Sequence, residues 1–223
     1  EYDNYKQGVV RVTFDGNGGK VDTTQADVVY KTTYGDKLPK TAVRTGYSFA
    51  GWYTEADGGK LITSESEVNQ AENFTLYAHW KANSYRINFN VNATGATVSP
   101  DFKEVFYDNE YGIMPTPVLS GTSFVGWYTK AVDGERILSD TKVKTTEDQT
   151  LYAHWSRNAY VITFNANGGN VSISSSKVTY GEPYGTLPTP TRDYYTFTGW
   201  YTAANGGDPV KADTTMKTAN NVV

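Results

Sequence analysis

The sequence predicts a mostly β protein of α+β type with little helix, arranged as tandem small modules in an extended rod. An internal repeat is the first observation: Trp52, Trp127 and Trp200 each follow Phe-x-Gly, and they recur at intervals of about 75 residues. The second observation is a strict alternation of apolar and polar residues around Phe14 and its counterparts, which is typical of half-buried strands. Glycine and asparagine clusters between these segments are the third, because they supply turns.

The first strand of each module is predicted from this alternation. In "VRVTF", Val10, Val12 and Phe14 point to one face and the residues between them point to the other. The same pattern occurs at Tyr85, Ile87 and Phe89, and again at Tyr160, Ile162 and Phe164. β-branched and aromatic residues in this pattern indicate a strand with one face in the core.

A hairpin and a crossover are expected after the first strand. The segments "DGNGGK" and "NANGGN" supply the positive-φ positions of a turn. A second strand then leads into a Tyr-x-x-x-Tyr-Gly phrase, as in "VVYKTTYG". The next stretch, "PKTAVRTGY" in the first module, has proline, glycine and β-branched residues but no helical stripe, so it is predicted to be an irregular crossover with at most one helical turn.

The Phe-x-Gly-Trp-Tyr-Thr phrase predicts another strand. Strict alternation would place Trp52 on one face with Ala50 and Thr54. Phe49 and Tyr53 would then share the opposite face. The glycine between them would let another backbone or a large ring approach closely.

The last strand of a complete module is predicted at "TLYAHW", after a weak strand at 60–63 and 136–139. Leu76, Ala78 and Trp80 share one of its faces, so it is expected to be a core strand.

The repeats define three predicted domains: module 1 at residues 1–81, module 2 at 82–156 and module 3 at 157–223. The boundaries fall at the tetrapeptides "KANS" and "SRNA". Because these connections are short, neighbouring modules should touch and form a semi-rigid rod. Module 3 contains every phrase of the repeat except "LYAHW".

The repeated tryptophans are interpreted as core residues. A module of about 75 residues without disulfides or an evident metal needs large apolar side chains. The predicted structural core therefore includes Trp52, Trp80, Trp127, Trp155 and Trp200. The alternative is an exposed aromatic platform for sugar rings or peptides, and its candidate binding residues are Tyr53, Tyr128 and Tyr201.

Composition bears on several classes of protein. The net charge is −4, so nothing indicates a nucleic-acid partner. The absence of cysteine excludes disulfides, thiolate zinc sites and cysteine nucleophiles. No apolar run reaches the roughly 20 residues that span a bilayer, and "EYDNYKQG" is not a signal peptide, so no membrane insertion is expected.

No catalytic, metal-binding or cofactor-binding pattern is found, so neither an enzyme nor a cofactor is predicted. "DGNGG" resembles the start of a calcium loop, but Asn90 and Asn165 replace Asp15 in the other modules and further acidic ligands are missing. His79 and His154 have no Cys or second His nearby and are expected on the solvent side or rim. "LPKTA" resembles a sorting signal, but no apolar tail and basic end follow it.

The order "VTFDGNGG", "YGDKLP", "GYSFAGWYTEADGG" and "LYAHW" resembles the Listeria–Bacteroides repeat, also called the internalin B-repeat. The resemblance covers almost the whole chain in three copies, although module 2 has "NVNATG" in place of the Asn-Gly-Gly phrase. It implies a small β-grasp-like fold, an extracellular setting and no catalytic residues. In a β-grasp arrangement the last strand lies beside the first, so module 3 is expected to be the least stable or to be completed by a strand from elsewhere.

The functional hypothesis is a non-catalytic extracellular repeat region of a bacterial surface or secreted protein. It would act as a stalk or spacer and as an adhesion or protein-interaction module. Its partner would be a protein or glycan on a host or neighbouring cell. The alternative is a glycan- or cell-wall-binding module that uses exposed aromatics.

Overall fold

The structure is a computed structural model that describes residues 8–219. In this range the regular elements are strands and one short 3-10 turn, η1 (Gly35–Lys37). The expectation of a mostly β protein is confirmed, while the α component of the predicted α+β class is wrong for the described residues, which contain no α-helix. The crossover predicted at "PKTAVRTGY" contains a two-residue strand, β4 (Ala42–Val43), and is otherwise irregular, whereas η1 lies just before it.

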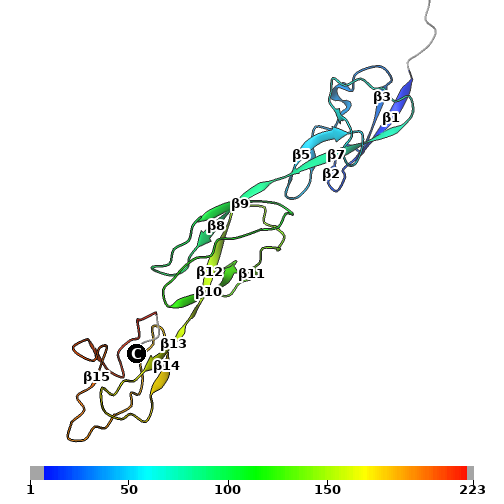
Figure 1. The fold of residues 1–223 in the computed structure, drawn as a ribbon. Helices are drawn as coiled ribbons and strands as arrows, with labels where there is room; N and C mark the ends of the chain where they lie inside the picture. The colour runs from blue at the N-terminus through cyan, green and yellow to red at the C-terminus, as the bar shows by residue number, and fades with distance from the viewer. Residues whose placement is uncertain (1–7, 220–223) are drawn as a thin grey trace, which may run out of the picture. The chain divides into compact units, whose positions relative to one another are not determined.

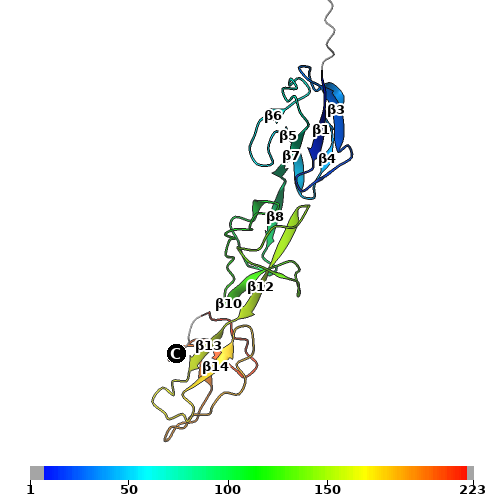
Figure 2. The ribbon, with the colours of Figure 1, turned by 90° about the vertical axis from the view of Figure 1, so that its right-hand side faces the viewer.

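Module 1 contains a five-stranded sheet in the order β3-β1-β7-β5-β6 (Figures 1 and 2). Its strands are β1 (Val9–Asp15), β3 (Gln25–Val29), β5 (Tyr47–Tyr53), β6 (Leu61–Ile62) and β7 (Phe74–Ala82). β1 and β7 are parallel, whereas β1–β3, β5–β7 and β5–β6 are antiparallel. The strand that carries "LYAHW" therefore lies at the centre of the sheet.

Module 2 repeats this topology, because its sheet has the order β11-β10-β12-β8-β9. Its strands are β8 (Ser84–Asn90), β9 (Phe102–Phe106), β10 (Thr122–Tyr128), β11 (Arg136–Ile137) and β12 (Gln149–Arg157). Read from the β9 end, each strand takes the place of its counterpart in module 1. A separate short pair in module 1 joins β2 (Lys20–Val21) to β4 (Ala42–Val43).

Module 3 has two separate two-stranded sheets. One pairs β13 (Ala159–Thr163) with β14 (Ser175–Thr179), and the other pairs β15 (Trp200–Tyr201) with β16 (Pro209–Val210). Among the described residues no strand joins the two sheets at the place that β7 and β12 occupy in modules 1 and 2.

The core of module 1 follows the predicted alternation. Val10, Val12 and Phe14 are buried on one face of β1, and the hairpin to β3 pairs Val10 with Val28. Leu76 and Ala78 of β7 are buried beside them. Burial of these apolar side chains is the main favourable term that holds the module together.

The predicted faces of the Phe-x-Gly-Trp strand are wrong. The pairing of β5 with β7 shifts by one residue between Phe49 and Gly51, which is a β-bulge. The bulge turns Phe49 and Trp52 to the same side, with ring centroids 5.4 Å apart, and leaves Ala50 exposed. Gly51 has a φ of 132°, which L side chains rarely adopt, so the recurrence of this glycine in all three modules has a conformational cause.

Close packing divides the described chain into two compact units that do not follow the module boundaries. The first contains the chain up to Ile87 together with Lys103–Gly112 and Ser139–Gln149. The second contains Asn88–Phe102, Ile113–Leu138 and the chain from Thr150 onward. Three segments of module 2 are thus grouped with module 1 in the first unit, and the rest of module 2 is grouped with module 3 in the second.

Candidate functional site

The connection between modules 1 and 2 is held by backbone hydrogen bonds on both sides of one asparagine. Asn83 donates its N–H to the carbonyl oxygen of Gly46 at 2.9 Å. Its own carbonyl oxygen accepts the N–H of Tyr107 at 3.0 Å. A single linker residue is therefore bonded to a turn of module 1 and to a strand end of module 2.

The ring of Tyr107 lies directly against Gly46. A Cβ added to Gly46 would lie 2.1 Å from the ring, and Gly46 has a φ of 77°. The ring contact therefore requires glycine, and the backbone conformation favours it. Tyr47 adds an edge-on contact with Tyr107, with ring centroids 5.5 Å apart.

The same arrangement occurs between modules 2 and 3, at Gly121, Asn158 and Tyr180. The Asn158 N–H donates to the Gly121 carbonyl oxygen at 2.9 Å, and the Tyr180 N–H donates to the Asn158 carbonyl oxygen at 2.8 Å. A Cβ at Gly121 would lie 2.2 Å from the Tyr180 ring. We call this repeated arrangement the Gly–Asn–Tyr junction, formed by Gly46, Asn83 and Tyr107 and by Gly121, Asn158 and Tyr180.

A serine supports the asparagine side chain at each junction. The hydroxyl of Ser48 donates to Oδ1 of Asn83 at 2.5 Å, and that of Ser123 donates to Oδ1 of Asn158 at 2.6 Å. Each asparagine is therefore fixed by its backbone and by its side chain.

The charged contacts differ between the two junctions. At the first, the Tyr47 hydroxyl donates to Oδ2 of Asp108 at 2.7 Å, and Lys144 pairs with the same carboxylate. The pKa of Asp108 is lowered by the hydrogen bond from Lys144 and then by the one from Tyr47. At the second junction Arg157 pairs with Glu182 instead. Exposed ion pairs of this kind contribute little to stability, so the shared backbone contacts define the junction.

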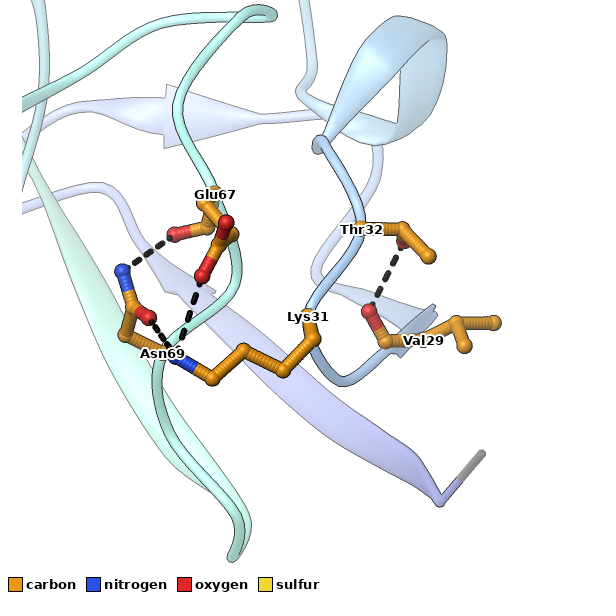
Figure 3. A network of polar contacts seen from close by, with 5 residues as sticks. All are labelled: Val29, Lys31, Thr32, Glu67 and Asn69. Atoms are coloured by element: carbon orange, nitrogen blue, oxygen red, sulfur yellow. Dashed lines mark hydrogen bonds and ion pairs between the residues drawn. The ribbon is translucent and has the colours of Figure 1, made fainter. Parts of the chain in front are cut away.

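Module 1 carries a different ion pair at the turn that corresponds to Asp108. Lys31 donates to Oε1 of Glu67 at 3.0 Å and to Oδ1 of Asn69 at 2.7 Å (Figure 3). Lys31 and Asp108 have nearly the same φ, 67° and 63°. The two modules therefore share the backbone conformation of this turn, but the side chain at its tip is basic in module 1 and acidic in module 2. The acidic residue of module 2, Asp108, accepts the hydrogen bond from Tyr47.

Module 3 replaces the junction glycine by a tyrosine. Tyr194 stands where modules 1 and 2 have Gly46 and Gly121, and it keeps the left-handed backbone with a φ of 65°. Its side chain is fully exposed. A tyrosine ring could not lie against this backbone position as Tyr107 lies against Gly46.

Each of the three candidate binding tyrosines belongs to a different module. Tyr53 stacks on His79 with ring centroids 3.9 Å apart, and Tyr128 stacks on His154 at the same distance. Each histidine therefore covers one ring face of its tyrosine. Tyr201 has no such stacking partner among the described residues and is 48 % exposed.

The five tryptophans differ in burial. Trp52 and Trp127 are each 2 % exposed, whereas Trp80, Trp155 and Trp200 are partly buried. The indole N–H of Trp52, Trp127 and Trp200 donates to the carbonyl oxygen of Pro39, Pro115 and Pro188 at 2.9, 2.8 and 2.8 Å. The proline after the Tyr-Gly phrase thus supplies the acceptor that a buried indole needs.

The "DGNGG" turn places an asparagine side chain on the central strand. Nδ2 of Asn17 donates to the carbonyl oxygens of Ala56 and Ala78, at 2.8 and 3.0 Å. Asn92 makes the same two contacts in module 2. Asn17 also has a φ of 46°, which asparagine tolerates better than most residues. The turn is therefore an anchor for the strand that follows much later in the sequence.

Replacing Asn17 by glycine should separate these two roles. Glycine keeps the positive φ but removes both hydrogen bonds, so we expect module 1 to lose about 1–2 kcal/mol of unfolding free energy in denaturant titrations. Asn167→Gly is the matched control, because Asn167 donates to one carbonyl, that of Ala204. Equal losses for the two variants would show that the contact with the central strand contributes nothing.

The residues of the junction were missed from the sequence, although a signal was present. Gly46 and Gly121 occupy equivalent positions, and so do Asn83 and Asn158 in the two short connections. Their recurrence was visible, but their contact partner lies in the next module. Local patterns indicate turns and strands and give no information about contacts across a module boundary.

Other kinds of site are not found in the described part of the chain. Residues 8–219 contain no cluster of three or more His, Asp or Glu side chains placed to bind a metal ion. No helix in the same range has the length and apolar character that crossing a membrane requires. The junction is thus the arrangement with the most specific geometry, and its contacts are those of packing and hydrogen bonding.

Comparison with known proteins agrees with the repeat pattern. The family model of the Listeria–Bacteroides repeat domain matches three segments, 11–79, 85–154 and 160–223. Two relatives from Evansella cellulosilytica are a "Putative Gly-rich membrane protein", 33 % identical over 85 % of this chain, and a "Putative membrane protein", 34 % identical over 90 %. Internalin H of Listeria monocytogenes is 40 % identical over 44 % of the chain.

The chain spans only a small part of each of these relatives. The matched region covers 22 % and 29 % of the two Evansella proteins and 18 % of internalin H. The three family matches together cover most of the chain. The chain therefore belongs to the Listeria–Bacteroides repeat family.

Proposed function

We propose that this chain is a non-catalytic spacer of a bacterial surface protein, in which the Gly–Asn–Tyr junction couples each module to the next. The observation that carries the proposal is the recurrence of the junction, with the same three backbone and ring contacts, at both module boundaries. A linker whose central residue is bonded on both sides has far fewer accessible conformations than a free one. Successive modules would then keep a fixed orientation to one another, so the array could act as a spacer and transmit force along its length.

The proposal includes β-grasp-like modules in an extended, semi-rigid rod. The mixed sheet supports the β-grasp-like fold of the module. β1 is the first strand of module 1 in the sequence and β7 is the last, yet the two strands are adjacent and parallel in the sheet. The short connections and the junction contacts support the semi-rigid array.

We further propose that the setting is extracellular, on the bacterial cell surface or after secretion. Support comes from the relatives, which are named as membrane proteins and as an internalin. Adhesion to a protein or glycan of a host or neighbouring cell is the accompanying role. The residues that bind such a partner would lie outside the junction, because the junction residues already contact the neighbouring module.

Spin-label distances test the spacer directly. Ala50 and Val125 are exposed, equivalent positions in β5 and β10, and the chain has no cysteine, so Ala50→Cys and Val125→Cys give a clean pair of labels. We expect a narrow distance distribution in double electron–electron resonance, and a broad one when Tyr107→Ala removes the ring from Gly46. A distribution that is equally broad without Tyr107→Ala would overturn the proposal.

Glycan binding through exposed aromatics is the second candidate, and the exposure of Tyr201 is the observation that favours it. Tyr53 and Tyr128 present less free ring surface to a sugar, because a histidine covers one face of each ring. A glycan array with the parent chain and with Tyr201→Ala tests this function. Binding that depends on Tyr201 would support it, and absence of any bound glycan would remove it.

A further inference from the structure

The outer face of the sheet in module 2 carries a row of three side chains from the neighbouring strands β11, β10 and β12 (Figure 1). Arg136 lies opposite Tyr128, and Tyr128 lies opposite Tyr152. The next residues along β10 and β12, Trp127 and Ala153, are buried in the core, so alternation turns the row to the other face of the sheet. We call Arg136, Tyr128 and Tyr152 the outer row of module 2.

The guanidinium of Arg136 lies over the backbone of Gly126 and is open to solvent. A Cβ added to Gly126 would lie 2.6 Å from Nε of Arg136, and Arg136 is exposed. None of the ion pairs between the described residues involves Arg136. A guanidinium of this kind can bind an anion, because its planar fork of N–H groups matches the two oxygens of a carboxylate.

His154 holds the ring of Tyr128 in place beside this guanidinium. The two rings stack with centroids 3.9 Å apart and planes 9° apart, and Nε2 of His154 donates to the carbonyl oxygen of Lys130 at 2.9 Å. His154 also lies opposite Gly126, the residue that Arg136 covers. The row is therefore held in one arrangement before any ligand binds, which lowers the entropic cost of binding.

Module 1 has the aromatic part of this row but not its charge. Tyr53 and Tyr77 lie opposite one another, and a histidine stacks on Tyr53 as in module 2. Leu61 stands in the place of Arg136 and covers a glycine in the same way, because a Cβ on Gly51 would lie 2.7 Å from its Cδ1. The two modules therefore share the shape of the row and differ in its charge.

The row of module 1 also ends at a carboxylate that module 2 lacks. Asp15 lies opposite Tyr77, whereas Asn90 replaces Asp15 in module 2. Both side chains accept the N–H of the second residue after them at 2.8 Å, so the exchange removes a charge and keeps the turn. Glu135 replaces Lys60, but it precedes β11 and lies outside the row. One aspartate thus gives the row of module 1 a negative charge, and one arginine gives that of module 2 a positive charge.

We propose that the outer row of module 2 binds a carboxylated sugar. Arg136 binds the carboxylate, and the ring and hydroxyl of Tyr152 contact the sugar ring. An extended peptide is a poor fit, because β10 and β12 each pair with two neighbouring strands and leave no free backbone edge. The proposal rests on the glycan-binding candidate and on its extracellular setting, but it places the sugar at Arg136 and not at Tyr201.

Titration of the full chain with matched oligosaccharides tests the site. Two probes end in a carboxylated sugar, glucuronate or sialate, and the control ends in glucose. We expect a carboxylated probe to shift the amide resonances of Gly126, Tyr128 and Tyr152, with an affinity that falls as salt is added. The preferred probe would separate uronate-rich polysaccharides from sialylated glycans as the source. Equal binding of the glucose probe, or no binding of either carboxylated probe, would overturn the proposal.

Arg136→Leu is the matched variant, because Leu61 shows that leucine fits over the glycine at this place. We expect its affinity for the carboxylated probe to fall at least about tenfold, as loss of a charge-assisted hydrogen bond does, with an unchanged melting temperature. The reciprocal variant, Leu61→Arg with Asp15→Asn, should give module 1 a second site of similar affinity. Full binding by Arg136→Leu would overturn the proposed site. If Tyr201→Ala then abolished binding, glycan binding would stand and only its assignment to Arg136 would fail.

Discussion

Replacing Trp52 by alanine is expected to lower the free energy of unfolding of module 1 by about 3–5 kcal/mol, the range for a buried large aromatic. Trp52 is 2 % exposed, packs on Phe14 with ring centroids 5.0 Å apart and donates its indole N–H to Pro39. A small domain is stabilised by only about 5–15 kcal/mol in total, so the module should melt well before its neighbours in scanning calorimetry.

The equivalent change in module 3 is the control for this prediction. Trp200 is only partly buried, whereas Trp52 and Trp127 are each 2 % exposed, so Trp200→Ala should cost clearly less than Trp52→Ala or Trp127→Ala. If Trp52→Ala kept its melting temperature but lost binding to a glycan or protein, the residue would be a binding platform rather than a core residue.

Replacing Gly46 by alanine is expected to loosen the first junction. The new Cβ would lie 2.1 Å from the Tyr107 ring, so the ring must move and the contact between modules 1 and 2 must open. Overpacking of this kind costs about 1–3 kcal/mol, in addition to the strain of a left-handed alanine. We expect faster hydrogen exchange at the Tyr107 amide and a lower unfolding temperature.

Gly58→Ala separates the clash from the backbone strain. Gly58 has nearly the same φ as Gly46, 75° against 77°, but a Cβ there would meet nothing within 4 Å. Both variants therefore carry the same conformational penalty, and only Gly46→Ala disturbs the junction. Equal destabilisation by the two variants would mean that the Tyr107 contact contributes nothing to the coupling of the modules.

Local structure was predictable from the sequence where the pattern of apolar and polar residues within one strand shows which of its faces is buried. Val10, Val12 and Phe14 alternate because β1 has one buried face, and the turn at Asn17 and Gly18 was visible in its composition. The faces of β5 were not predictable, because the bulge before Gly51 shifts the register by one residue and strict alternation no longer holds.

The contacts that matter for coupling were outside the reach of local patterns. Asn17 looked like a turn residue only, yet its side chain anchors a strand that begins at Phe74. Gly46 and Asn83 recur in module 2 for a reason that becomes visible only when Tyr107 is placed against them. Sequence spacing alone gives the recurrence of such residues, whereas their function depends on which distant residue they contact.

Small-angle X-ray scattering of the chain in solution tests the proposed spacer most directly. A compact globule of 223 residues would have a radius of gyration of about 17 Å. If the Gly–Asn–Tyr junctions hold the modules in an extended array, the measured radius of gyration should be clearly larger than this value and should not change with protein concentration. A radius of gyration near 17 Å would show that the modules fold back on one another, and it would contradict the spacer proposal.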